Sequence, residues 1–421
     1  MGQNPKSVLS LICFFQPSIF SHMKCLQGLF ALLLFYSYSY AQPATKLSAR
    51  VPGIVIAHSP ASSGLYIGSP SICILPDGSY LASHDLFGPA SNEFVQPESL
   101  IYRSVNKGKS WHQVAVIKGQ FWSKLFVHRG KLYFMGTDKH HGNTIIRTSA
   151  DNGVTWTEPM DEDHGLLLRG EYHCAPMPVI IHNGRIWRTM EDAMGEIKKW
   201  GKRYGVMMLS APENADLMKA ASWTHSNVLH YDATLLNGNF GGWIEGNAVV
   251  DSSGNILNIL RVDDKGSQDE KAAVVHISAD GKTASFDTAS GFIPFDGGSK
   301  KFSICYDSVT KLYWCFSNII PTAIKAANPG KNPASIRNTL ALLSSPDLLH
   351  WNLRKIVLSH PDDLKHGFQY PDWAFDGKDI LLVSRTAYDD NEGGAHNQHD
   401  ANFLTFHRIK KFRKLPVFRK D

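Results

Sequence analysis

The sequence has little of what several protein classes require. Its 43 Lys and Arg against 38 Asp and Glu give a formal net charge of +5, and no basic stripe with interleaved aromatic residues occurs, so nucleic acid is not an expected partner. Helical periodicity is nearly absent, and residues 193–201 are the single short helical candidate. Charged residues make up 19% and hydrophobic residues 43% of the 421 positions, an ordinary globular balance. The chain is therefore expected to bury a large core.

Cysteine is also scarce. Of the six cysteines, four lie beyond the N-terminal region, at Cys73, Cys174, Cys305 and Cys315. None has the spacing of a zinc site. Each lies in an apolar, strand-like run, which favours buried thiols. A disulfide between Cys305 and Cys315 is the alternative in an exported protein.

The N-terminal region has the pattern of a secretory signal. Met23 and Lys24 precede an apolar run over residues 29–35, and small residues follow up to Ala41. The run is too short for a transmembrane anchor, so membrane attachment is not expected. We expect Met23 to be the true start, residues 1–41 to be an extension plus signal peptide, and residues 42–421 to form one domain that is periplasmic or secreted.

The octapeptide Ser-Ala-Asp-Asn-Gly-Val-Thr-Trp at residues 149–156 is the unit from which the chain is built. The Asp can accept hydrogen bonds from the backbone of its own turn, the Gly supplies a positive φ angle, and the Trp covers the turn. Weaker copies occur at residues 104–111, 210–223, 278–281 and 345–351. Recurrence of one hairpin at intervals is typical of a propeller or solenoid.

A second repeat alternates with the first: an apolar strand, a tight polar turn and another apolar strand. These hairpins divide the chain into units that begin near Ser69, Phe121, His173, Trp243, Lys301 and Tyr370. The strand at residues 51–57 is expected to pair with the C-terminal strand at 402–409 and close a ring, which protects the sheet edges. The sequence thus predicts an all-β fold, a β-propeller of four-stranded blades with six repeats.

In a propeller, the start of each first strand and the end of each second strand meet at one central pocket, and the Trp-capped turns lie on the opposite face. Cations, His, Tyr and Trp dominate these positions. The candidates are His58, His84, Lys124, Arg169, Tyr172, His173, Arg188, Glu191, Trp243, Glu245, Arg261, Tyr370, Arg385 and His399. Guanidinium groups pair with carboxylates and aromatic faces stack on sugar rings, so this set suits an anionic sugar. The alternative is that Arg and Glu at strand ends pair with one another across blades.

The Trp-capped turns resemble the repeat of sialidases. Sialidases begin their first strand with an Arg that helps to bind the substrate carboxylate, whereas Gly68 stands at the corresponding place here. A true sialidase is therefore disfavoured, although the fold can be shared.

Three other stretches resemble a different family. Residues 64–88, 171–176 and 399–409 are similar to secreted seven-bladed propellers that remove L-rhamnose α-1,4-linked to glucuronic acid in arabinogalactan-type glycans. These are the glycoside hydrolase family 145 enzymes and the related rhamnose–glucuronate lyases. The resemblance implies seven blades, one more than the repeat count gives.

This resemblance implies hydrolysis that depends on one histidine, for which His58 is the candidate. Such an imidazole can donate a proton to the leaving oxygen and then deprotonate water. A pair of carboxylates, Glu191 and Glu245, is the more usual arrangement for glycoside hydrolysis.

The lyase alternative is β-elimination at the uronate. A cation must neutralise the carboxylate and a His or Tyr must remove a proton, and Tyr172, His173 and Arg188 supply these groups, with His84 as a further base or acid. The other candidates listed above for the pocket are expected to bind substrate. A glycan-binding propeller without chemistry is the hypothesis from another class.

No cofactor is expected. His396, His399 and Asp400 lie in one polar loop, and Asp138, His140 and His141 lie in another, but neither group has strong ligand spacing. The expected partner is an acidic plant-type polysaccharide or oligosaccharide, bound by a monomer.

Overall fold

The computed structural model describes residues 51–418, so the expected signal sequence at residues 1–41 lies outside the described residues. Within 51–418, no helix is long and apolar enough to cross a membrane. The helix α1 (Thr322–Ala327) is a single short element. The helix expected at residues 193–201 is wrong: this segment forms turns, because Gly201 has a φ of 82° and the Arg203 side chain holds the Ala193 carbonyl oxygen at 2.7 Å.

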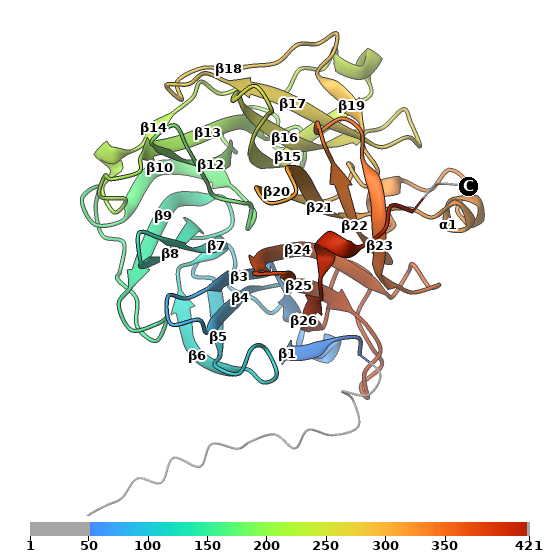
Figure 1. Cartoon of the computed structure of the whole chain (residues 1–421), viewed down its shortest axis with the longest axis horizontal. Helices are drawn as coiled ribbons and strands as arrows, with labels where there is room; N and C mark the ends of the chain where they lie inside the picture. The colour runs from blue at the N-terminus through green and yellow to red at the C-terminus, as the bar shows by residue number, and fades with distance from the viewer. Residues whose placement is uncertain (1–50, 419–421) are drawn as a thin grey trace, which may run out of the picture. The chain divides into compact units, whose positions relative to one another are not determined.

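Strand pairing gives five antiparallel sheets in the described chain, one of which spans two repeats, so the strands form six successive units, as the repeat count predicts (Figure 1). The first three units contain β2 (Tyr66–Ile67), β3 (Ser71–Ile74), β4 (Tyr80–Phe87), β5 (Glu98–Ser104), β6 (His112–Lys118), β7 (Phe121–His128), β8 (Lys131–Thr137), β9 (Gly142–Ser149), β10 (Leu166–His173), β11 (Ile180–His182), β12 (Arg185–Asp192), β13 (Gly205–Pro212) and β14 (Thr224–His225).

The last three units contain β15 (Phe240–Val250), β16 (Ile256–Asp264), β17 (Lys271–Ile277), β18 (Ala284–Ser285), β19 (Phe292–Pro294), β20 (Ser303–Asp307), β21 (Leu312–Asn318), β22 (Thr339–Ser345), β23 (Asn352–Ser359), β24 (Gly367–Asp376), β25 (Asp379–Ala387) and β26 (Phe403–Ile409), joined by β1 (Ile54–His58). Strand β10 pairs with β9 and with β12, so the second and third units form one eight-stranded sheet. Within 51–418 no strands remain for the seventh unit that the resemblance implies.

The predicted pairing of the N-terminal strand with the C-terminal strand is confirmed. β1 pairs antiparallel with β26, with His58 opposite Phe403, so the N-terminal strand completes the last unit. Six clusters of buried apolar residues each join two successive units, and one of them packs Ile72 and Tyr80 of the first unit against Leu381 and Phe406 of the last. The core therefore lies between the sheets and runs around the whole ring.

The Trp-capped turn has the expected construction at residues 149–156. Asp151 accepts hydrogen bonds from the Thr155 amide at 2.9 Å and from its hydroxyl at 2.6 Å, while the Trp156 indole donates to the Gly153 carbonyl at 3.0 Å. These bonds lower the pKa of Asp151 to about 2. Successive strands of a unit are antiparallel. The Trp-capped turns therefore lie at the same end of each unit as the tight turns that join its first and second strands.

The expectation of buried thiols is confirmed for Cys73, Cys174 and Cys315, and Cys305 is half-buried. All four are free, so the alternative disulfide between Cys305 and Cys315 is not formed.

Candidate functional site

Each of the strands β7, β15 and β24 contains a β-bulge, and the residue in the bulge is aromatic or acidic. Strand register breaks between Phe121 and Lys124 in β7, between Ile244 and Asn247 in β15, and between Gln369 and Asp372 in β24. The residues inside these breaks have positive φ angles: 49° for Trp122, 58° for Glu245 and 53° for Tyr370. Positive φ is unfavourable for such residues, and bulges next to active sites commonly serve to redirect a side chain.

A pocket of about 290 Å³ lies at this end of the ring, and every unit contributes to it. It is lined by Gly68, Ser69, Phe87, Glu93, Phe121, Trp122, His140, His173, Trp200, Arg261, Arg337, Tyr370, Arg385 and His399. Strands and loops of all six units thus meet at one pocket.

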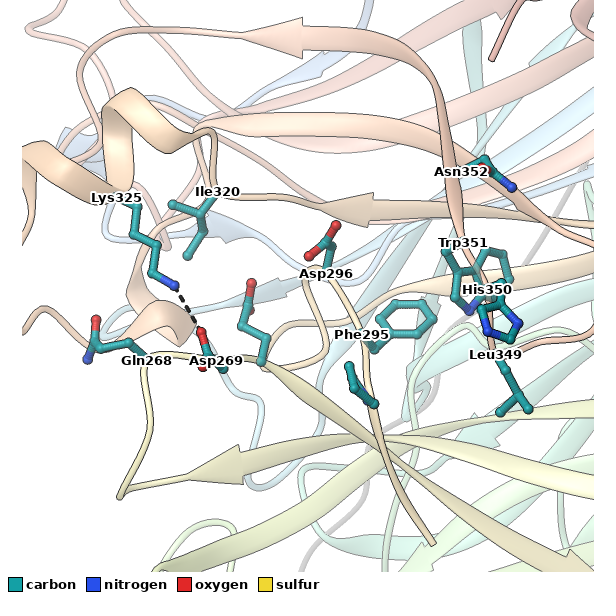
Figure 2. Close-up of a pocket in the computed structure, with 12 residues that line it drawn as sticks. Gln268, Asp269, Phe295, Asp296, Ile320, Lys325, Leu349, His350, Trp351 and Asn352 are labelled. Atoms are coloured by element: carbon teal, nitrogen blue, oxygen red, sulfur yellow. Dashed lines mark hydrogen bonds and ion pairs between the residues drawn. The ribbon is translucent and has the colours of Figure 1, made fainter. Parts of the chain in front are cut away.

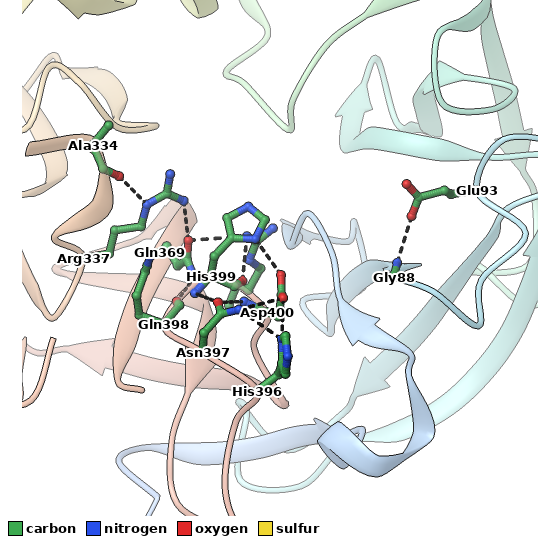
Figure 3. A network of polar contacts seen from close by, with 11 residues as sticks. Gly88, Glu93, Ala334, Arg337, Gln369, His396, Asn397, Gln398, His399 and Asp400 are labelled. Atoms are coloured by element: carbon green, nitrogen blue, oxygen red, sulfur yellow. Dashed lines mark hydrogen bonds and ion pairs between the residues drawn. The ribbon is translucent and has the colours of Figure 1, made fainter. Parts of the chain in front are cut away.

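Three arginines bring positive charge into this pocket. Arg337 donates to Gln369 Oε1 at 2.5 Å (Figure 3). Arg385 donates to the His399 carbonyl at 2.9 Å. Arg261 donates to Glu245 Oε2 at 3.0 Å. All three guanidinium groups are buried. Burial, and to a lesser extent the charge of the neighbouring Arg261, lower the pKa of Arg337 to about 10.

Tyr370 and Glu245 form a hydrogen-bonded pair among these arginines. Although burial acts to raise the pKa of Glu245, the charge of Arg261 and the hydrogen bond from Tyr370 hold it below its ordinary value. Burial and the charge of Glu245 raise the pKa of Tyr370. Glu245 is therefore an ionised acceptor, and the Tyr370 hydroxyl keeps its proton at neutral pH until a base removes it.

Glu93 lies across the pocket from the arginine network (Figure 3). Its carboxylate accepts the Gly88 amide at 3.0 Å and lies 3.2 Å from His140 Nδ1. Burial acts to raise the pKa of Glu93, but the interaction with His140 and the hydrogen bond from Gly88 outweigh it and lower the pKa.

Two further histidines are oriented by carboxylates. His173 Nδ1 lies 2.8 Å from Glu191, and its ring meets Trp122 edge-on with centroids 4.1 Å apart. His399 Nδ1 lies 2.7 Å from Asp400. Burial and the charge of Arg385 lower the pKa of His399 to about 3, so its imidazole is neutral at ordinary pH.

The structure brings together half of the residues predicted from the sequence. His173, Arg261, Tyr370, Arg385 and His399 line the pocket. Glu191 and Glu245 lie directly behind the lining, in contact with His173 and Arg261.

The other half do not reach the pocket, and the expectation for them is corrected. Four of these are buried elsewhere or turned away. His58 Nε2 donates to Asp390 at 3.0 Å, and its ring stacks on Phe403 outside the lining. His84 is buried against the Asp85 carbonyl at 2.9 Å, and burial lowers its pKa to about 4.

Arg188 is fully buried and donates to the Ala175 carbonyl at 2.6 Å, while Lys124 pairs with Asp372 at 2.5 Å. Both cations are buried, and neither lines the pocket.

The remaining three candidates either pack in the core or form a surface ion pair. Tyr172 and Trp243 belong to the apolar clusters between units, where they pack as core residues. Arg169 is exposed and donates to Glu162 at 2.8 Å. This pairing is the alternative that the sequence left open for strand-end charges.

Sequence reasoning missed Glu93, Trp122, Trp200 and Arg337. Glu93, Trp200 and Arg337 lie in loops, which a search restricted to strand ends does not reach. A usable signal was available for Glu93, because the connection between β4 and β5 is long, polar and located at the pocket end of its unit.

A second, wider hollow of about 680 Å³ lies between the fourth and fifth units (Figure 2). Lys325 donates to Asp269 at 3.0 Å on one side, and Trp351 of a capped turn lies on the other. The lining of this hollow comes from two neighbouring units alone. It does not include the Tyr370–Glu245 pair. The central pocket is therefore the better candidate for chemistry.

No family model and no curated protein matches the chain. Solved structures do match it. The α-L-arabinanase of Penicillium chrysogenum complexed with arabinobiose is 13% identical, with 87% of this chain and 99% of that chain covered and a TM-score of 0.53. A protein of unknown function from Dyadobacter fermentans is 11% identical, with 86% and 98% covered and a TM-score of 0.56. The Hadza microbial sialidase Hz136 is 14% identical, with 85% and 68% covered and a TM-score of 0.54. At these identities the likeness concerns the fold, and it agrees with a β-propeller.

Proposed function

We propose that this protein is an exported glycoside-cleaving enzyme that acts on a glycan at a sugar bearing a carboxylate. The observation that carries the proposal is the grouping of Arg261, Arg337 and Arg385 around the hydrogen-bonded Tyr370 and Glu245. Three buried guanidinium groups gathered at one pocket favour an anionic ligand. Two proteins of similar structure are named as an arabinanase and a sialidase, which are both glycoside-cleaving enzymes.

The chemistry follows from the positions of three groups. Glu245 accepts the proton of the Tyr370 hydroxyl, so that the phenolate oxygen can attack the anomeric carbon. Glu93, on the far side of the pocket, donates a proton to the leaving oxygen and afterwards deprotonates the incoming water. Tyrosine nucleophiles are a known exception to the usual pair of carboxylates in glycoside hydrolysis. The arginines hold the carboxylate, and Trp122 and Trp200 offer aromatic faces to the sugar.

The specific linkage that we propose is L-rhamnose α-1,4-linked to glucuronic acid. One observation favours it: each of the three stretches that carry the sequence resemblance reaches the pocket, through Gly68, Ser69, Phe87, His173 and His399. On this proposal the arginines bind the glucuronate. Elimination at the uronate remains the alternative chemistry, with His173 or Tyr370 as the base.

The test uses acidic and neutral substrates side by side. Purified protein is incubated with gum arabic and with aryl glycosides of glucuronic acid, sialic acid and L-rhamnose. Release of rhamnose from gum arabic supports the proposed linkage, and ultraviolet absorbance from an unsaturated uronate would indicate elimination. Cleavage of the sialoside alone would replace the linkage but keep the proposed chemistry. Binding of acidic sugars without any cleavage would favour the glycan-binding hypothesis and contradict the enzymatic one.

A further inference from the structure

The connection between β23 and β24 holds a group of metal-ligating side chains that lies outside the pocket. His360, Asp362 and His366 each offer one ligand atom, and these atoms all lie within 4.8 Å of one another. The two imidazole rings stack with centroids 3.5 Å apart. Among the described residues 51–418, it is the one group of three or more His, Cys, Asp or Glu side chains with such spacing.

His366 is the central member of this group. Its side chain is buried, with a relative exposure of 5% for the residue. Nδ1 lies 2.8 Å from Asp362 Oδ2. A carboxylate accepts hydrogen bonds, so Nδ1 carries a proton, and in the neutral form of the imidazole Nε2 then presents a lone pair. This is the arrangement in which a carboxylate orients a metal-binding histidine.

The surroundings of His366 Nε2 call for a cation. This atom is buried and has no hydrogen-bond partner, and the nearest charged oxygen is Asp389 Oδ1 at 3.4 Å. A lone pair that faces a carboxylate oxygen is repulsive unless a positive charge lies between them. A tetrahedral ion with bonds of about 2.0–2.1 Å separates its ligand atoms by about 3.4 Å, which fits this gap.

We propose that His366 Nε2 and Asp389 bind a divalent transition-metal ion of the Zn²⁺ type, with Asp362 orienting His366 and with His360, whose ring stacks on that of His366, as a further donor. Imidazole nitrogens with a carboxylate are the donor set that suits such ions. His360 Nδ1 accepts the Asp362 amide at 3.1 Å, a long hydrogen bond that coordination through this nitrogen would replace. Asp389 is exposed, so the ion has a path from solvent.

The loop is tied to the pocket wall at two points. Asn338, which follows Arg337, donates to the His360 carbonyl at 2.6 Å. The amide of Gln398, which precedes His399, donates to the Leu364 carbonyl at 2.7 Å. A bound ion would therefore stabilise the loop against the segments that carry Arg337 and His399.

The test is direct binding, so its result does not depend on the proposed function. The protein is stripped with EDTA and titrated with Co²⁺, whose visible absorption reports tetrahedral coordination, and Zn²⁺ is then added in competition. We expect one equivalent of Co²⁺ per chain, displaced by Zn²⁺, and a rise in melting temperature with Zn²⁺. Asp362→Asn is expected to weaken binding about 10- to 100-fold.

His366→Gln is expected to abolish the absorption band. Asp389→Asn is the second variant, because this exposed side chain is not needed for folding, and it should weaken binding at least about tenfold. The matched control is His350→Gln: His350 Nδ1 also lies near a carboxylate, 2.7 Å from Asp347, but it is exposed. Absence of a tetrahedral Co²⁺ band in the wild type would overturn the proposal. So would equal Co²⁺ affinity in the wild type and in Asp389→Asn, a result that would show that Asp389 is not a ligand.

Discussion

Tyr370 and Glu245 belong to different units of the ring, yet a hydrogen bond joins them, and both sit in β-bulges with positive φ angles of 53° and 58°. Such conformations cost about 1–3 kcal/mol each for residues other than glycine. The surrounding sheets must offset this cost, since β15 and β24 both continue beyond the bulge as long paired strands. Strain of this kind at two interacting residues is the strongest structural argument that the pair has a function beyond stability.

The first prediction separates chemistry from binding. Tyr370→Phe removes the hydroxyl but keeps the ring over which Arg385 lies, 4.4 Å from its centroid. We expect kcat on an acidic glycoside to fall at least about 100-fold, the usual scale for loss of a reacting or proton-transfer group, with little change in Kd. Tyr204→Phe is the control, because its hydroxyl contacts His141 at 2.9 Å and does not line the pocket. Retention of more than a tenth of the activity in Tyr370→Phe would contradict the role of a nucleophile.

The second prediction concerns the carboxylate. Arg337→Met removes a buried charged donor, and each such hydrogen bond is worth about 1.5–3 kcal/mol, so the Kd for glucuronate should rise about 10- to 100-fold. Calorimetry with glucuronate and glucose measures the effect, and the neutral sugar should bind equally in both proteins. Arg169→Met serves as the control, since Arg169 is exposed and paired with Glu162. An equal loss for both sugars would indicate a general disturbance of the pocket.

The third prediction is a pH dependence. A general acid works in its protonated form, and the pKa of Glu93 is lowered, so kcat/KM should be highest at acidic pH and fall as the pH rises through that pKa. Burial alone would raise this pKa, and the interaction with His140 opposes it. In His140→Ala, the decline should therefore move to higher pH. His164→Ala, which removes an exposed partner of Asp161, should leave the profile unchanged. A shift toward lower pH in His140→Ala would exclude Glu93 as the acid.

The fold was predictable because its signals are local. Each Trp-capped turn closes on itself through bonds such as those of Asp151, and each inner hairpin needs little beyond its own turn residues. Even the long-range pairing of β1 with β26 was expected, because a ring of sheets leaves only short protected edges. The sequence resemblance implied seven units, whereas the repeats counted in the chain itself predicted the six units observed among the described residues.

The site was only partly predictable, and the bulges explain why. Side chains along a strand alternate between faces, so one inserted residue changes which of them faces the pocket. In β7 the bulge places Trp122 in the pocket, while the predicted Lys124 turns inward to Asp372. In β15 the predicted Trp243 packs in the core, and Glu245 in the bulge reaches Arg261. Nothing in the alternation of the sequence reveals where a register breaks.

The last prediction tests the position at which a sialidase would carry its first arginine. Gly68 donates its amide to the Asp85 carbonyl at 2.7 Å, and a Cβ at this position would lie 2.8 Å from that oxygen. Asp85 is buried and accepts the Trp122 amide at 2.8 Å, so any displacement reaches the bulge in β7. Gly68→Ala should therefore lower stability by about 1–3 kcal/mol, as overpacking does, and thermal unfolding measures it. Ser69→Ala adds no atom at the next position and should unfold close to the wild type. For the same reason Gly68→Arg should destabilise the protein without tighter binding of acidic sugars. If that variant were stable and bound glucuronate more tightly, the site could accept the sialidase arginine, and the contact between Gly68 and Asp85 would not be what excludes it.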